Sequence, residues 1–120
     1  MKYAYKVVCK TNGVFTSTSS CGQFFYGLNY ELNKETFPDF GKIFVFRSLY
    51  DAQQFATGSS ILNILKCSIK GELKEITKVS FFLHRDMLEL FWIDPNKVSL
   101  IGAPNGSFIA DSVTPLEIVL

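Results

Sequence analysis

The side chains in this chain that could do chemistry are suited to binding a ring and a negative charge. Arg47 and Tyr50 lie at the junction between a predicted strand and a predicted helix, and Ser48 stands at the N-terminus of that helix. Free amides at a helix N-terminus beside a guanidinium attract an anion, and an aromatic ring can stack on a base. The candidate ligand-binding residues are Lys6, Tyr26, Arg47, Ser48, Tyr50 and Trp92.

Three of these candidates also have an ordinary structural explanation. Ser48 fits a helix N-cap, because its hydroxyl can accept a hydrogen bond from the first turn. Arg47 fits the solvated end of a strand, and Trp92 fits a core or an interface. Ligand binding by this set is therefore a hypothesis.

The chain offers little to a catalytic site. Its one histidine, His84, stands between predicted elements beside Arg85 and Asp86, and neighbours in sequence rarely converge as a triad. No serine-elbow, zinc-helix or glycine-rich phosphate motif is present. The sequence therefore predicts no catalytic residue and no cofactor.

Three cysteines, Cys9, Cys21 and Cys67, lack the paired spacing of a zinc site. The sequence predicts neither a metal site nor a disulfide framework, and Cys67 fits a small apolar core residue. No apolar run approaches the ~18 residues of a membrane span, and the first ten residues lack the apolar core of a signal peptide. We expect a reducing, cytoplasmic location and no membrane partner.

Size and charge narrow the class of protein further. The 120 residues fit one domain, residues 1–120, and the net charge of +1 comes without a long basic run. Nucleic acid is therefore a disfavoured partner. Twelve phenylalanines suit a tightly packed core, or an apolar surface that covers a partner or a second copy of the chain.

Residues 41–58 organise the predicted fold. Apolar residues on both faces of residues 42–47 indicate a central strand, and Ser48 then caps a helix that Gly58 ends. We expect residues 43–46 and 49–55 to share one core. Residues 3–10 and 14–17 read as a hairpin around the turn at 11–13.

The rest of the chain favours more strands. Residues 65–70 alternate as a half-buried strand, a further strand is expected late in 72–83, and residues 84–95 have room for one or two helical turns. A hairpin of 97–102 with 107–113 around the turn at 104–106, and a last strand at 116–120, complete the prediction. The expected fold is α+β: mostly antiparallel sheet of about six to eight strands with one or two short helices packed on it.

Three stretches resemble a kind of small, uncharacterised phage-encoded domain. They are Tyr-Lys-Val-Val at residues 5–8, Gly-Lys-Ile-Phe-Val-Phe-Arg-Ser-Leu-Tyr-Asp-Ala-Gln-Gln-Phe-Ala at 41–56, and Gly-Ser-Phe-Ile-Ala-Asp-Ser-Val-Thr-Pro-Leu-Glu-Ile-Val at 106–119. The resemblance implies a phage or prophage origin and names no activity.

The order of elements is distantly similar to the ADP-ribosyltransferase-like fold. That similarity implies three motif positions, at Lys6, at Ser48 with Tyr50, and at Glu117 or Asp111. It also implies a groove shaped for a nucleotide.

Two hypotheses for function follow. The first is a non-enzymatic viral binding protein that sequesters a nucleotide-like small molecule, such as a host immune signal, or masks a host protein, with a role in counter-defence. The alternative is an ADP-ribosyltransferase-like enzyme that uses NAD.

Overall fold

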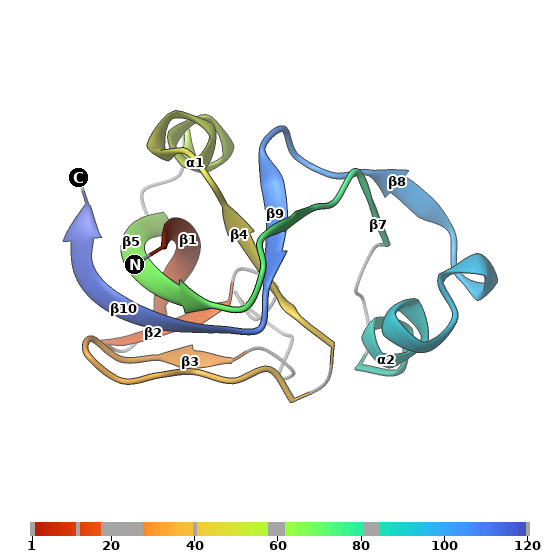
Figure 1. Ribbon diagram of the computed structural model, residues 1–120, viewed down its shortest axis with the longest axis horizontal. Coiled ribbons are helices and arrows are strands. Elements are labelled where there is room, and N and C mark those ends of the chain that lie inside the picture. The colour runs from red at the N-terminus through yellow and green to blue at the C-terminus, as the bar shows by residue number, and fades with distance from the viewer. Residues whose placement is uncertain are drawn as a thin grey trace.

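The chain folds into a curled, mostly antiparallel sheet with two α-helices on its outer side (Figure 1). The computed structural model describes residues 2–11, 13–17, 28–39, 41–57, 62–80 and 85–119. The strands are β1 (Tyr3–Thr11), β2 (Val14–Ser17), β3 (Asn29–Tyr30), β4 (Ile43–Phe46), β5 (Leu62–Lys70), β6 (Lys74–Glu75), β7 (Lys78–Ser80), β8 (Leu100–Gly102), β9 (Ser107–Ala110) and β10 (Ser112–Val119). The helices are α1 (Leu49–Ala56), α2 (Arg85–Ile93) and the short 3₁₀ helix η2 (Pro95–Lys97).

The main sheet has eight strands, with the order β10-β5-β1-β4-β9-β6; β2 also pairs with β1, and β3 pairs with β2. A second sheet pairs β7 with β8. All described strand pairs are antiparallel. The α+β class predicted from the sequence is confirmed, and β4 is a central strand as expected.

The inner face of the curled sheet holds the larger core. β1 turns Ala4, Lys6 and Val8 to this face, and its register with β5 sets Ala4 opposite Cys67 and Lys6 opposite Leu65. The curl is visible in Figure 1, where β10, β5 and β1 bend around a common interior. Cys67 is fully buried there, which confirms the core role predicted for it.

The outer face carries α1. Phe46 packs with Ala52 of this helix, and the rings of Phe46 and Phe55 lie 5.3 Å apart. Ile43 and Val45 instead belong to the inner core, because successive residues of a strand point to opposite faces. The expected core shared between β4 and α1 therefore forms, but with only half of the strand.

α2 also lies on the outer side, at the end of the molecule that carries β7 and β8 (Figure 1). The predicted one or two turns become a nine-residue helix. The Phe44 ring lies 5.4 Å from the Trp92 ring and 6.3 Å from the Phe91 ring. β4 thus contacts both helices, α1 through Phe46 and α2 through Phe44.

The predicted hairpin of residues 97–102 with 107–113 is wrong. β8 pairs with β7, and β9 pairs with β4 and β6. The amide of Ala103 donates to Thr77 O at 2.9 Å, and the amide of Ser107 donates to Pro104 O at 3.2 Å. The predicted turn at 104–106 therefore forms, but it leads the chain from the small sheet to the main sheet. A turn motif between two predicted strands does not determine which strands those two pair with.

The last strand is also longer than predicted. It begins at Ser112, where the sequence analysis had it begin at residue 116, and it runs through Pro115 with a register shift between Pro115 and Glu117. A proline lacks an amide donor and is tolerated at a sheet edge or a bulge. β10 offers both, because it is the last strand in the sheet order.

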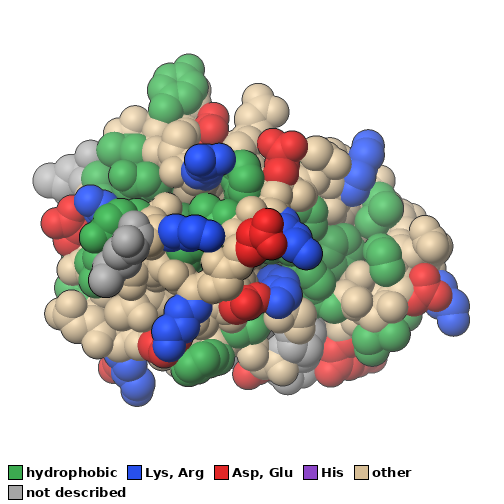
Figure 2. Space-filling view, in the orientation of Figure 1, with side chains coloured by type: hydrophobic (Ala, Val, Ile, Leu, Met, Phe, Trp, Pro, Cys, Tyr) green, Lys and Arg blue, Asp and Glu red, His purple; other side chains and the backbone are tan. Residues whose placement is uncertain are grey.

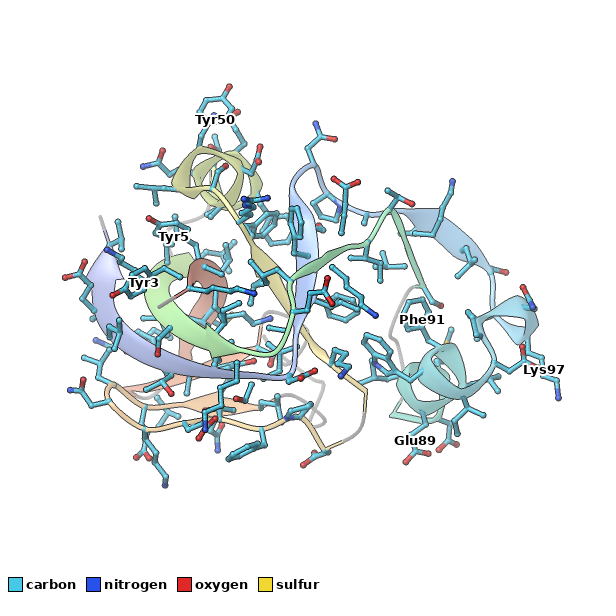
Figure 3. All side chains as sticks on the ribbon, viewed as in Figure 1. Tyr3, Tyr5, Tyr50, Glu89, Phe91 and Lys97 are labelled. Atoms are coloured by element: carbon cyan, nitrogen blue, oxygen red, sulfur yellow. The ribbon has the colours of Figure 1, made fainter. Side chains whose placement is uncertain are left out.

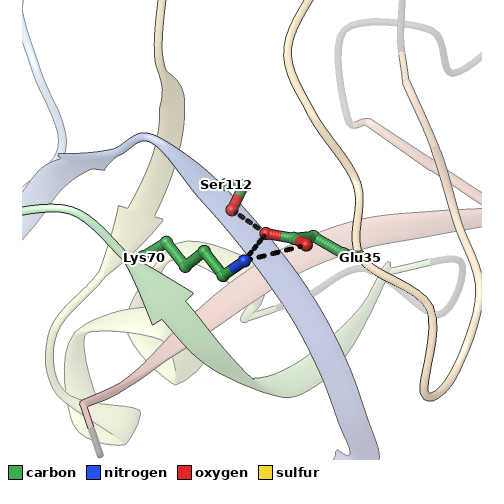
Figure 4. Close-up of polar contacts among 3 residues, drawn as sticks. All are labelled: Glu35, Lys70 and Ser112. Carbon is green, nitrogen blue, oxygen red and sulfur yellow. Dashed lines mark hydrogen bonds and ion pairs between the residues drawn. The ribbon is translucent and has the colours of Figure 1, made fainter.

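The segment 31–39 is tied to the sheet by backbone and side-chain bonds. Thr36 exchanges two backbone hydrogen bonds with Val113. The Glu35 carboxylate accepts hydrogen bonds from Ser112 Oγ and Lys70 Nζ (Figure 4). These bonds cover the first half of the outer edge of β10.

Cys9 is buried and disulfide-bonded, whereas Cys67 is free. This disulfide was not predicted from the sequence, because three cysteines without paired spacing do not indicate a disulfide framework. Disulfides are typical of proteins that fold in an oxidising compartment. The reducing, cytoplasmic location therefore stays a prediction.

Candidate functional site

A groove of about 750 Å³ separates α2 from the outer face of β9 and β6. This volume lies within the range of small-molecule sites. The groove is lined by Gly41, Lys42, Glu72, Lys74, Glu89, Trp92, Ile93, Ile109 and Asp111. Figure 2 shows acidic and basic side chains gathered at the centre of this face, with hydrophobic side chains beside them toward β7 and β8.

Strand register builds the sheet side of the groove. Phe44 pairs with Ile109, and Ile109 pairs with Lys74, so the three side chains stand in a row across β4, β9 and β6. Leu73 packs on the inner core, and alternation then sends Glu72 and Lys74 to the groove face. The sheet thus supplies an apolar floor with charges at its edge.

The helix side is built around Trp92. Its indole stacks on Phe44 with an angle of 29° between the rings, and Phe91 meets it edge-on at 5.1 Å. Gly41 has a φ of +69° and lies so close to the indole that a Cβ there would come within 2.3 Å of its ring atoms. The aromatic contacts and Gly41 hold the indole in one place, and its half-buried remainder faces the groove.

Two lysines and three carboxylates line this groove. Lys42 forms an ion pair with Asp111 across the start of β4 and the end of β9. Lys74 and Glu72 have no ion pair among the described residues. Glu89 projects from α2, where Figure 3 labels it with Phe91. The groove therefore presents an aromatic surface beside both signs of charge.

Lys6 lies in the inner core, away from this groove. Its side chain shares the face of Ala4 and Val8, donates to Phe44 O at 2.7 Å, and has its amine 5.8 Å from the Tyr30 ring centroid. Burial lowers the pKa of Lys6 to about 8, against a smaller raising effect of Cys67. Burial in turn raises the pKa of Cys67 to about 12 and raises that of Tyr30.

The residues at the start of α1 are used by the fold. The Ser48 hydroxyl accepts from the Asp51 amide at 3.1 Å and donates to the Asp51 carboxylate at 2.9 Å. A carboxylate of the chain itself therefore occupies the helix N-terminus that the sequence analysis offered to an anion. Arg47 lies 5.8 Å from the Phe108 ring, and Tyr50 is 66% exposed and projects from α1 (Figure 3).

The structure therefore gathers the sequence-derived candidates in three places. Arg47, Ser48 and Tyr50 lie together at the start of α1, Lys6 lies in the inner core, and Trp92 lines the groove. Tyr26 and His84 fall outside the described residues, so their placement stays a prediction.

The positions implied by the ADP-ribosyltransferase-like similarity are likewise dispersed. Lys6 is in the inner core, Ser48 caps α1, and Glu117 is exposed on the edge strand β10. Asp111 pairs with Lys42 at the groove. These side chains have no mutual contact among the described interactions.

Sequence reasoning missed Lys42, Lys74 and Glu72 as groove residues. The alternation of Glu72 and Lys74 around Leu73 was a local signal for an exposed polar face beside a buried residue. Nothing local could indicate that α2 would lie opposite that face, because the facing arrangement depends on how β6, β9 and β4 pair.

No helix within the described ranges is both long and apolar enough to cross a bilayer. Over the same residues, no three histidine, cysteine or acidic side chains are grouped as metal ligands. Comparisons of the chain with protein families, curated proteins and solved structures return no match. The phage-domain and ADP-ribosyltransferase-like resemblances therefore stay predictions.

Proposed function

We propose that this protein is a binding protein that holds a nucleotide-like small molecule in the groove between α2 and β9. The observation that carries the proposal is the fixed indole of Trp92 beside Lys42 and Lys74. An aromatic surface stacks on a base, and a lysine ammonium acts as a point charge for a phosphate. The groove supplies both groups within one concave surface.

The proposed ligand lies at Trp92 and not at the start of α1. The Ser48 hydroxyl and the helix N-terminus are already engaged by Asp51. A ligand phosphate there would have to displace this carboxylate or lie beside it, at a cost from like charges. The groove imposes no such displacement at Lys74.

Holding the ligand, without converting it, fits the chemistry of the lining. The described groove residues include no serine, cysteine or histidine that could act as a nucleophile or a proton shuttle. A role in counter-defence and a host protein as the partner rest on the phage-domain resemblance alone.

Intrinsic fluorescence tests the proposal directly, because Trp92 is the single tryptophan of the chain. We expect nucleoside monophosphates, ADP-ribose or NAD to change its emission in a saturable way, and calorimetry to give the same Kd. Lys74→Gln should weaken binding, whereas Lys78→Gln, an exposed lysine of β7 outside the groove, should not.

A folded wild-type protein that shows neither heat nor an emission change with any of these compounds at millimolar concentration would overturn the proposal. Equal affinities of Lys74→Gln and Lys78→Gln would refute the groove as the site. Circular dichroism of each variant verifies that it is folded.

A further inference from the structure

The charges of the groove limit what kind of nucleotide it can hold. Two lysines and three carboxylates line the groove, so the lining carries no excess of positive charge. Polyphosphate sites use several cations or a bound metal to neutralise the phosphates. A ligand with many negative charges would meet repulsion here, because Lys42 is already paired with Asp111.

Glu72 and Lys74 form a pair of opposite charges with a defined spacing. They lie two residues apart and both line the groove, while Leu73 between them packs against the core, which is the alternation of an extended chain. Two residues of a strand span about 7 Å, so a negative and a positive group stand on one face at about that separation. Trp92 lines the same groove from α2.

These features match a ligand with one anionic group, one hydrogen-bond donor group and a flat ring. Resting on the proposed function, we infer that the groove selects an amino-bearing purine nucleotide of low negative charge: Lys74 holds the phosphate, Glu72 accepts from the amino group of the base, and Trp92 contacts the ring. Glu72 is then a specificity-determining residue. Its carboxylate accepts a hydrogen bond from an amino group and repels a carbonyl oxygen at the same position of the base.

Titrations with three adenine nucleotides show how the charge of the ligand affects its affinity while the base stays the same. Cyclic AMP, AMP and ATP share the base and increase in negative charge. We expect cyclic AMP and AMP to bind more tightly than ATP, in metal-free buffer at low salt, because like charges repel over these distances.

The role of Glu72 is read from the ratio of the Kd values of IMP and AMP, which differ in the amino group and have the same charge. We expect AMP to bind about tenfold more tightly, since a hydrogen bond to a charged acceptor is lost in IMP and an oxygen faces the carboxylate. Glu72→Ala should bring the ratio close to one. Glu75→Ala is the matched control, since Glu75 is an exposed glutamate three residues further along the chain, on β6, and lies outside the groove lining.

The outcomes distinguish this inference from the proposed function. Nucleotide binding with ATP tightest, or an IMP-to-AMP ratio that Glu72→Ala leaves unchanged, overturns the inference and leaves the binding groove standing. Absence of binding by every nucleotide overturns the proposed function and this inference with it.

Discussion

Lys6 is a buried cation without a carboxylate partner among the described residues, and such a group shapes the pH dependence of a fold. Its one described hydrogen bond goes to a backbone carbonyl, that of Phe44. The side chain shares the interior with Tyr30 and with Cys67, whose thiol also resists ionisation. The free-energy cost of removing the Lys6 ammonium from water exceeds the gain from its hydrogen bond to one carbonyl and its contact with one aromatic ring.

Stability should therefore rise between pH 8 and pH 9. The pKa of Lys6 falls from 10.5 to about 8 on folding, so the unfolded chain binds more protons above pH 8 and stability increases with pH. Above pH 9 Cys67 opposes the rise, because its pKa of about 12 in the fold exceeds the ordinary 9.0 and the folded thiol keeps its proton. We expect a gain of about 1 kcal/mol over that pH unit, measured by urea unfolding.

Lys6→Met should abolish this rise. A methionine of similar length removes the titrating group, so the free energy of unfolding of this variant should no longer rise from pH 7 to pH 9 and should exceed that of wild type at pH 7 by about 1–3 kcal/mol. A wild-type protein whose stability does not change between pH 8 and pH 9 would contradict the burial of a charged Lys6.

At acid pH, Glu35 should affect the stability of the fold through a lowered pKa. Its hydrogen bond from Ser112, with the nearby Lys70, lowers the pKa of the carboxyl, so the stability that it contributes is present above its unfolded pKa and is lost as pH falls through the folded one. Glu35→Gln should lower the melting temperature at pH 7 and leave it unchanged at the acid end of the titration. Glu31→Gln, an exposed acid on the same segment with a surface ion pair, is the control.

At the scale of elements, α1 shows how much a local pattern can predict. Spacing predicted a strand at residues 42–47 and a helix capped by Ser48, and the structure has them as β4 (Ile43–Phe46) and α1 (Leu49–Ala56). These elements could be predicted because the pattern that defines each of them lies within a few residues. The hydrogen bond between Ser48 and Asp51 is equally local. The local sequence pattern could not show that the Asp51 carboxylate would itself occupy the helix N-terminus and leave no place there for an anionic ligand.

Removing the cap should loosen α1. Ser48→Ala deletes the acceptor for the Asp51 amide and the donor to its carboxylate, and we expect a loss of about 1 kcal/mol in the free energy of unfolding. Ser48→Thr keeps the hydroxyl and should restore most of the loss. Equal stability of Ser48→Ala and wild type in chemical denaturation would show that the cap does not form.

Gly41→Ala tests the close packing of the Trp92 indole of α2 on Gly41. Gly41 and Gly13 both have positive φ values, +69° and +79°, but an added Cβ meets the Trp92 indole at Gly41 and nothing within 4 Å at Gly13. Both alanine variants carry the backbone cost of roughly 1–2 kcal/mol. Gly41→Ala should lose more than Gly13→Ala and should also shift the tryptophan emission maximum; identical losses with unshifted spectra would refute the close packing on Gly41.

At the scale of the whole molecule, the groove exists because of pairings between distant parts of the chain. β4 and β9 bring Phe44 beside Ile109, β6 adds Lys74, and the β7–β8 sheet leads the chain into and out of α2. The sequence predicted the α+β class and most strands, since alternation and turns are local. It placed β8 against β9, because two β-like runs around Pro104-Asn105-Gly106 look the same whether or not they pair with each other.

In the candidate site, too, some residues could be predicted from the sequence and others depend on how the strands pair. Trp92 was predicted as a ligand-binding residue from its type alone, whereas Lys42, Glu72 and Lys74 gain their meaning only from the sheet order. Arg47, Ser48 and Tyr50 lie together at the start of α1, as their spacing predicts, whereas Lys6 lies apart from them in the inner core.

The most direct test of the groove is a two-dimensional NMR titration of the ¹⁵N-labelled protein with AMP. The chain has one indole N–H, that of Trp92, so its cross-peak reports on the site without ambiguity. We predict that this peak and the amides of Lys74 and Ile109 shift together and saturate at one Kd. Shifts confined to the amides of Arg47, Ser48 and Tyr50, with the Trp92 indole unmoved, would contradict the groove and return the site to the start of α1.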